Sequence, residues 1–336
     1  MSDPDQPPTA DRLTALLDDG DDEETVAFLN RLGAADADAR KRVLRAARDA
    51  VDERPSRFEG LAPPLASFLT DDDRAVRLTT AKLFVALARS APAVALPVVD
   101  ALAERLADDG EFYYVRARCA EALGYLAVDS PDAVADPATL ADLRVGLSFD
   151  EPEVREKLAK ALAYVALGDS DRLRHQVDSL AERLGDEREL VRYHLCTALV
   201  VVGCAHPARL ADAEDALRER LADGNPYVRG RAAEALGLFA ASDAPLGPSL
   251  DLDDTDAETG ETPSFLTDRV RFCRRRLTGE RRGADSAAVG TVASVREGTD
   301  DAVTAMTSPD EGECPQCGLA LPETGPPTCP RCGAPY

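Results

Sequence analysis

The sequence predicts an all-α solenoid of about six helix pairs, followed by a small metal-binding module. Three observations lead to this prediction. The apolar content is 44%, but only 5% of the residues are aromatic and there is no Trp, which is typical of closely packed helices rich in small residues. Two CxxC pairs lie close to the C-terminus. The dipeptide Val-Arg recurs every 37 to 39 residues, at Val76-Arg77, Val115-Arg116, Val154-Arg155, Val191-Arg192 and Val228-Arg229.

Each Val-Arg pair opens an amphipathic helix, which we name helix B. An acidic turn precedes helix B, and another helix, helix A, precedes that turn. One repeat is therefore helix A, acidic turn and helix B, and Ala39-Arg40 marks a degenerate first copy. Repeats of this length stack so that each unit buries the apolar face of its neighbour. The acidic turns are Asp71–Asp73, Asp108–Glu111, Asp150–Pro152, Asp186–Glu187 and Asp223–Pro226.

The segments 115–124 and 228–237 closely resemble the PBS-lyase-type HEAT repeat, and the resemblance extends over about residues 25–241. It implies a right-handed superhelix with the B helices on the concave side. It also implies a structural ladder, in which the turn acids bind the repeat Arg residues of neighbouring repeats: Arg77, Arg116, Arg155, Arg192 and Arg229.

The positions two and five residues after each repeat Arg point away from the predicted core. They hold seven cations and two acids, a local sum of +5 in a chain of net charge −23. We predict that this basic, Tyr-lined strip binds a protein with an acidic surface. The alternative is a solvated helix face with local i,i+3 pairs such as Arg118–Glu121, and Lys157 and Lys160 have no such local partner. The candidate partner-binding residues are Arg118, Tyr125, Lys157, Lys160, Tyr164, His194 and Arg231.

The overall charge argues against nucleic acid or an anionic membrane as the main partner, because the mean field repels both. Abundant acids with only four Lys also resemble the composition of proteins from salt-loving archaea. No secretory signal or membrane-spanning apolar run is evident, so we expect a cytoplasmic protein. The isolated Cys residues fit a reduced compartment and small buried side chains rather than a disulfide framework.

The composition also predicts the domain boundaries. We expect a disordered N-terminus at residues 1–10, the solenoid at 11–241 and an acidic, Pro- and Gly-rich linker at 242–263. Residues 264–313 hold a helix at 264–278 and a weaker one at 287–306. The first helix either caps the last repeat or, being basic and amphipathic, docks on a partner or a membrane.

The tail at residues 314–336 contains two Cys-Pro-x-Cys-Gly knuckles. Two such knuckles supply the four thiolates of a closed, tetrahedral, structural zinc site, which leaves no open position for catalysis. The tail therefore resembles a minimal zinc ribbon holding one structural Zn²⁺; a redox pair is the other interpretation. The expected ligands are Cys314, Cys317, Cys329 and Cys332.

The chain as a whole resembles a haloarchaeal HEAT-repeat protein with a C-terminal zinc ribbon. This resemblance favours a non-catalytic scaffold or adaptor, with the ribbon as an accessory contact. Two alternatives remain: a nucleic-acid-associated zinc-ribbon protein, and a lyase-type HEAT-repeat enzyme. The ribbon is almost neutral, and the His-Glu pairs of di-iron HEAT hydroxylases are absent, since His175, His194 and His206 are not followed by Glu.

Overall fold

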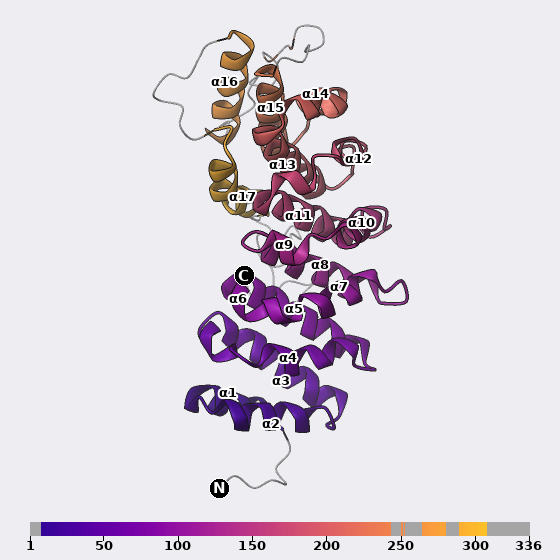
Figure 1. Cartoon of the computed structure of the whole chain (residues 1–336), viewed down its shortest axis with the longest axis vertical. Coiled ribbons are helices and arrows are strands. Elements are labelled where there is room, and N and C mark those ends of the chain that lie inside the picture. Colours follow the sequence, from indigo (N-terminus) through magenta and orange to yellow (C-terminus); the bar gives the residue numbers. More distant parts are fainter. Residues whose placement is uncertain (1–7, 243–249, 251, 253–263, 280–288, 308–336) are drawn as a thin grey trace, which may run out of the picture.

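The computed structural model describes residues 8–242, 250, 252, 264–279 and 289–307. Within these ranges the chain is helical and contains no strand, and its helices stack in one elongated array (Figure 1). The predicted all-α solenoid is therefore confirmed. The six B helices are α3 (Ala37–Val51), α5 (Arg74–Ser90), α8 (Tyr113–Ala127), α11 (Pro152–Gly168), α13 (Glu189–Ala205) and α15 (Pro226–Ala240).

The A helices are shorter than the B helices and lie beside them. They are α2 (Asp22–Leu32), α4 (Ala62–Ala66) continued by η2 (Ser67–Thr70), α7 (Val99–Ala107), α10 (Pro137–Gly146), α12 (Val177–Ala181) and α14 (Glu214–Arg220). An additional helix, α1 (Ala10–Asp19), precedes them. Short turns complete the links between repeats: η1 (Pro55–Phe58), α6 (Pro92–Ala95), η3 (Leu96–Val98), α9 (Pro131–Val134), η4 (Ser170–Arg172) and η5 (Pro207–Ala213).

The turn residues explain where the B helices begin. Asp36, Asp73 and Asn225 are N-caps whose side chains accept hydrogen bonds from the first free backbone N–H groups of α3, α5 and α15. Pro152 and Pro226 occupy the first position of α11 and α15, where a missing N–H group costs nothing. The polar turns of the repeat are thus helix start signals as well as sources of negative charge.

The core follows the predicted register of the B helices. The residues three, four and seven positions after the repeat Arg are fully buried in the four C-terminal repeats, as Cys119, Ala120 and Leu123 illustrate in α8. Small residues let successive B helices approach closely. A Cβ atom at Gly124 would lie 2.7 Å from the Cα atom of Ala161, so α8 and α11 touch nearly backbone to backbone.

Inter-repeat ion pairs run along the edge where the acidic turns meet the B helices. The guanidinium groups of four repeat Arg residues each donate to a carboxylate of the next turn. The pairs are Arg40–Asp71 at 2.8 Å, Arg77–Glu111 at 2.8 Å, Arg155–Asp186 at 2.7 Å and Arg192–Asp223 at 2.7 Å. Most of these Arg residues also donate to carbonyls of their own turn, so each one ties a turn to its neighbour.

Two members of the expected ladder behave differently. Arg116 binds no acid of the next turn, where Phe149 occupies the position of Asp71, Asp186 and Asp223, and it pairs instead with Asp109 of its own turn at 3.2 Å. Its guanidinium lies 5.0 Å from the Phe149 ring centroid and donates to the Leu106 carbonyl at 2.8 Å. Arg229 belongs to the last repeat and donates to carbonyls of its own turn. The ladder is thus interrupted at Arg116 and ends at Arg192.

Two further helices lie against the C-terminal end of the array (Figure 1). Helix α16 (Ser264–Leu277) packs along α15 and buries Leu266, Val270, Phe272 and Cys273. Helix α17 (Val292–Thr307) contacts α13 and α11 through a stripe formed by Val295, Thr299 and Ala302. The expected linker, apart from residues 242, 250 and 252, and the expected ribbon lie outside the described residues.

Candidate partner-binding surface

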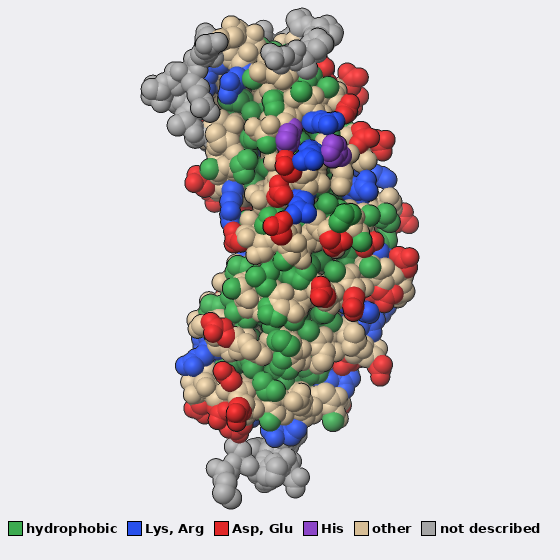
Figure 2. Space-filling model, in the orientation of Figure 1, with side chains coloured by type: hydrophobic (Ala, Val, Ile, Leu, Met, Phe, Trp, Pro, Cys, Tyr) green, Lys and Arg blue, Asp and Glu red, His purple; other side chains and the backbone are tan. Residues whose placement is uncertain are grey.

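The predicted strip lies on the B-helix face, by which we mean the surface formed by positions two, five and nine after each repeat Arg. Figure 2 shows one side of the molecule, on which many acidic side chains lie along the margins of the solenoid. On the B-helix face, cations are grouped around a few buried acids. Helix α17 covers the C-terminal half of this face.

A buried carboxylate organises the middle of the B-helix face. Glu121 of α8 is 4% exposed and is bound by Arg118 at 2.6 Å and by Lys160 of α11 at 3.1 Å, while Lys157 lies 3.8 Å away. Burial alone would raise the pKa of Glu121, but the opposing charges of Lys160, Lys157 and Arg118 lower it to about 2. Glu121 is therefore ionised and is neutralised across the boundary between two repeats.

Lys157 and Lys160 have no i,i+3 partner in the described part of the chain, but both are paired in other ways. Besides Glu121, Lys160 bonds the Tyr125 hydroxyl at 2.7 Å and lies 4.5 Å from the centroid of that ring. Lys157 pairs with Glu156 at 2.9 Å. Lys160 reaches Glu121 and Tyr125 of the preceding repeat, and Lys157 pairs with the adjacent residue Glu156. A search for i,i+3 pairs within one helix therefore missed these contacts.

Three of the predicted partner-binding residues are covered by the chain itself. The Tyr164 hydroxyl donates to Asp300 of α17 at 2.6 Å. Arg231 is fully buried and donates to Thr299 of α17 at 3.2 Å. His194 is 1% exposed. The prediction that these three residues contact a partner is therefore corrected, because α17 or neighbouring side chains enclose them in this structure.

A buried ionic cluster fastens the C-terminal helices to the last repeat. Glu234 of α15 is fully buried and accepts from Arg231 at 2.8 Å and from Arg269 of α16 at 2.9 Å. It also accepts a hydrogen bond from the Gly290 backbone N–H, just before α17, at 2.9 Å. Burial would raise the pKa of Glu234, but Arg231 and Arg269 hold it below its ordinary value. The sequence contained both Arg231 and Glu234, but Arg269 gave no signal of this role.

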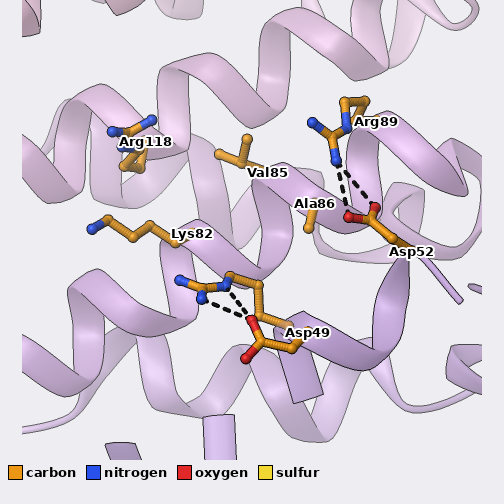
Figure 3. A pocket seen from close by; sticks show the side chains of 8 residues that line it. Asp49, Asp52, Lys82, Val85, Ala86, Arg89 and Arg118 are labelled. Atoms are coloured by element: carbon orange, nitrogen blue, oxygen red, sulfur yellow. Dashed lines mark hydrogen bonds and ion pairs between the residues drawn. The ribbon is translucent and has the colours of Figure 1, made fainter. Parts of the chain in front are cut away.

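The N-terminal half of the B-helix face is open and hollowed. One hollow, of about 280 Å³, lies between α3, α5 and α8, and Figure 3 shows its lining, which includes Lys82, Arg89 and Arg118. A second hollow, of about 200 Å³, is bordered by Tyr125, by Tyr164 and by Arg296 and Asp300 of α17. Arg89 lines both hollows, so they adjoin. Of the seven predicted residues, Arg118, Tyr125, Lys157 and Lys160 keep partial exposure.

The described cysteines show no sign of reactivity or metal binding. Cys119, Cys196 and Cys273 are buried, and Cys204 is partly buried. Burial raises the pKa of Cys196 to about 12, so its thiol stays protonated at neutral pH. Within the ranges that the structure describes, no three His, Cys, Asp or Glu side chains form a group that could hold a metal ion. The four predicted zinc ligands lie outside these ranges.

No helix in the described ranges is both long enough and apolar enough to cross a membrane.

The fold and the C-terminal repeats can be compared with known proteins. Residues 177–250 match the family model for HEAT repeats. This HEAT-repeat match begins at α12 and includes α13, α14 and α15. No curated protein matches the sequence.

Several solved structures share the fold at low sequence identity. An engineered protein from the Northeast Structural Genomics Consortium is 18% identical, with a TM-score of 0.58 over 88% of this chain and 71% of its own. A computationally designed armadillo repeat protein for modular peptide recognition is 17% identical, with a TM-score of 0.51 over 68% of this chain and 98% of its own. Another designed armadillo repeat protein, in complex with the peptide (KR)4, is 18% identical with the same TM-score and coverage.

Proposed function

We propose that the protein is a non-catalytic scaffold whose B-helix face binds a partner protein with an acidic surface. The observation that carries this proposal is the cluster of Arg118, Lys157 and Lys160, three partly exposed cations grouped around the buried acids Glu121 and Glu156, with Arg118 also lining the first hollow. Partly dehydrated cations attract carboxylates more strongly than fully solvated ones do. Tyr125 adds an aromatic surface beside them.

The designed armadillo neighbours support the proposal by analogy of architecture. One was made for peptide recognition and another holds a basic peptide, so a stack of helical repeats can carry a peptide-binding face. Here the charge of the face is positive, and the matching ligand is therefore acidic. The HEAT-repeat match in residues 177–250 is consistent with such a scaffold.

Affinity capture from native lysate, followed by mass spectrometry, tests the scaffold function. We expect wild-type bait to retain a protein that Lys157→Glu bait recovers about tenfold less, because a reversed charge repels the acidic surface. Lys157 suits this test because its side chain is more exposed than that of Lys160, and because its partner Glu156 is also bound by Arg188. Lys41→Glu is the matched control, since Lys41 pairs with Asp38 away from both hollows. Equal recovery on all three baits would contradict the proposal.

We further propose that residues 314–336 form a zinc ribbon that acts as a second, tethered contact. The donor set of four thiolates in two Cys-Pro-x-Cys-Gly knuckles supports one structural Zn²⁺, bound by Cys314, Cys317, Cys329 and Cys332. A segment this short has no core of its own, so the metal would supply most of its folding free energy.

Metal analysis of the purified protein tests the ribbon. We expect one zinc ion per chain in the wild type and loss of zinc in Cys317→Ser. Cys204→Ser is the control, because Cys204 lies in α13 outside the knuckles, and it is expected to keep the metal. A zinc-free protein with all its thiols reduced would contradict the ribbon.

A further inference from the structure

The hollow between α3, α5 and α8 carries an uncompensated positive charge. We name it the Lys82 hollow; four cations line it: Arg48, Lys82, Arg89 and Arg118. Figure 3 shows Lys82 and Arg118 reaching toward the same side of the hollow from successive B helices. Two carboxylates also line it, so the six charged side chains sum to +2.

The two carboxylates are already bound. Asp49 accepts from Arg48 at 2.8 Å, and Asp52 accepts from Arg89 at 3.1 Å. Arg118 binds Glu121. Lys82, by contrast, makes no hydrogen bond or ion pair with any part of the chain that the structure describes. It is the one lining cation whose charge has no counter-charge within reach in those ranges.

The surroundings of Lys82 disfavour its charge in the free protein. Burial, followed by repulsion from Arg118, Arg48 and Arg45, lowers the pKa of Lys82 below its ordinary value. A ligand that brings negative charge into the hollow would relieve this repulsion. The partly buried side chains of Val85 and Ala86 offer apolar surface beside the charged groups.

The adjoining hollow shows how an acidic segment lies on the same face. There α17 places its Asp300 carboxylate on the Tyr164 hydroxyl, and Arg296 of α17 pairs with Asp129. Arg89 lines both this hollow and the Lys82 hollow, so the two are continuous along the face toward α3. Helix α17 borders the first hollow but not the Lys82 hollow. Among the described residues, no segment covers the Lys82 hollow.

We propose that the Lys82 hollow is the anchoring subsite for a Glu or Asp side chain of the partner, whose acidic segment lies along the B-helix face between α3 and α17. This inference rests on the proposed function and gives it a specific anchor. In the complex the Lys82 ammonium donates to the partner carboxylate, and Arg118 shares its charge between Glu121 and the ligand.

Fluorescence anisotropy with a labelled peptide of alternating Asp and Glu tests the anchor on the full chain. We expect Lys82→Gln to weaken peptide binding about tenfold, the usual effect of losing one charge-assisted hydrogen bond. The same substitution should leave the melting temperature unchanged or raise it, because it removes repulsion. Lys41→Gln, which deletes the same charge from a Lys paired with Asp38, should bind the peptide like the wild type.

Several results would overturn the anchor. One is equal peptide affinity in wild type and Lys82→Gln. Another is tighter binding of a single-stranded oligonucleotide than of the peptide, with the same dependence on Lys82. A third concerns the acidic stretch after α17: if replacing Asp310, Glu311 and Glu313 by amides tightens peptide binding about tenfold, the occupant is the chain itself.

The peptide assay and the capture assay can fail separately. If Lys82→Gln weakens the peptide while Lys157→Glu bait loses no protein, the anchor stands and the proposed scaffold contact is wrong. If Lys157→Glu bait loses its protein while Lys82→Gln binds the peptide normally, the scaffold stands and the anchor is wrong.

Discussion

Replacing Glu234 by Gln is expected to cost about 3–5 kcal/mol of unfolding free energy, the effect of breaking a buried ion pair from one side. Glu234 is fully buried and faces two guanidinium groups, those of Arg231 and Arg269. Arg231 has no solvent exposure, and the side chain of Arg269 is 9% exposed. The amide would leave both positive charges buried without a counter-ion.

The consequence should be concentrated in the C-terminal helices. Glu234 is the group that contacts α15, α16 and the backbone before α17, through Arg231, Arg269 and Gly290. In a repeat array each unit depends on its nearest neighbours, so loss of this cluster frees α16 and α17 before the N-terminal repeats unfold. We therefore expect faster proteolysis at these helices together with a lower urea midpoint.

Urea unfolding followed by circular dichroism measures the effect, with Glu219→Gln as the control. Glu219 lies in α14, is 73% exposed and pairs with Arg220, so its loss should change stability by less than about 1 kcal/mol. Replacing all three charges together, in Arg231→Met, Glu234→Leu and Arg269→Met, should recover most of the lost stability because no charge stays buried. A Glu234→Gln midpoint equal to that of the wild type would show that the cluster does not stabilise the end of the array.

The solenoid could be predicted because each repeat carries the same local signals. The Val-Arg spacing, the capping residues and the small apolar columns recur, and each helix packs on a neighbour of the same kind. The ladder was expected from the resemblance to HEAT repeats, and it is interrupted where Phe149 replaces the turn acid. Placing Phe149 in register with Asp186 and Asp223 would have shown that the usual acid of the next turn is missing for Arg116.

The site was harder to predict because its charges pair between repeats. Glu121 and Lys160 occupy the same register position in successive repeats, 39 residues apart. Comparing the residues at the same position of successive repeats, rather than residues within one helix turn, would have found this pair. The apolar stripe of Val292, Val303 and Met306 predicted a helix near α17. Such a stripe indicates that the helix packs on another surface, but it does not indicate which one. The place of α17 on Tyr164 and Arg231 depends on the shape that several repeats build together.

The stability of the protein is expected to fall by about 2 kcal/mol between pH 7 and pH 5 because of His194. This residue of α13 is 1% exposed, and its Nδ1 atom has no hydrogen-bond partner among the residues that the structure describes. Burial, reinforced by the positive charges of Lys160 and Lys157, lowers its pKa from 6.5 to about 3. Below pH 6.5 His194 is therefore protonated in the unfolded chain but stays neutral in the folded chain until the pH approaches 3.

The sign and the pH range follow from these two pKa values. The contribution of neutral His194 to the unfolding free energy is fully present above the unfolded pKa of 6.5. It is lost steadily as the pH falls toward the folded pKa of about 3. The carboxylates add their own acid sensitivity only at lower pH, since Glu121 has a pKa of about 2 in the folded protein against an ordinary value of 4.5. The range from pH 7 to pH 5 thus isolates the histidine.

Urea denaturation at these two pH values tests the role of His194. A His194→Leu variant keeps an apolar side chain of similar size in the cavity and cannot take up a proton, so its unfolding free energy should change little between pH 7 and pH 5. His206→Gln is the control, because His206 binds Asp171 at the surface, and this variant should keep the wild-type dependence. If His194→Leu retains the full loss of stability, His194 is not the group responsible.

Because Lys160 and Lys157 reinforce the low pKa of His194, this histidine also reports whether a bound acidic partner changes the charge on the B-helix face. A partner that neutralises these lysines should make the folded protein less sensitive to acid in this range, since protonation of His194 would then meet less repulsion.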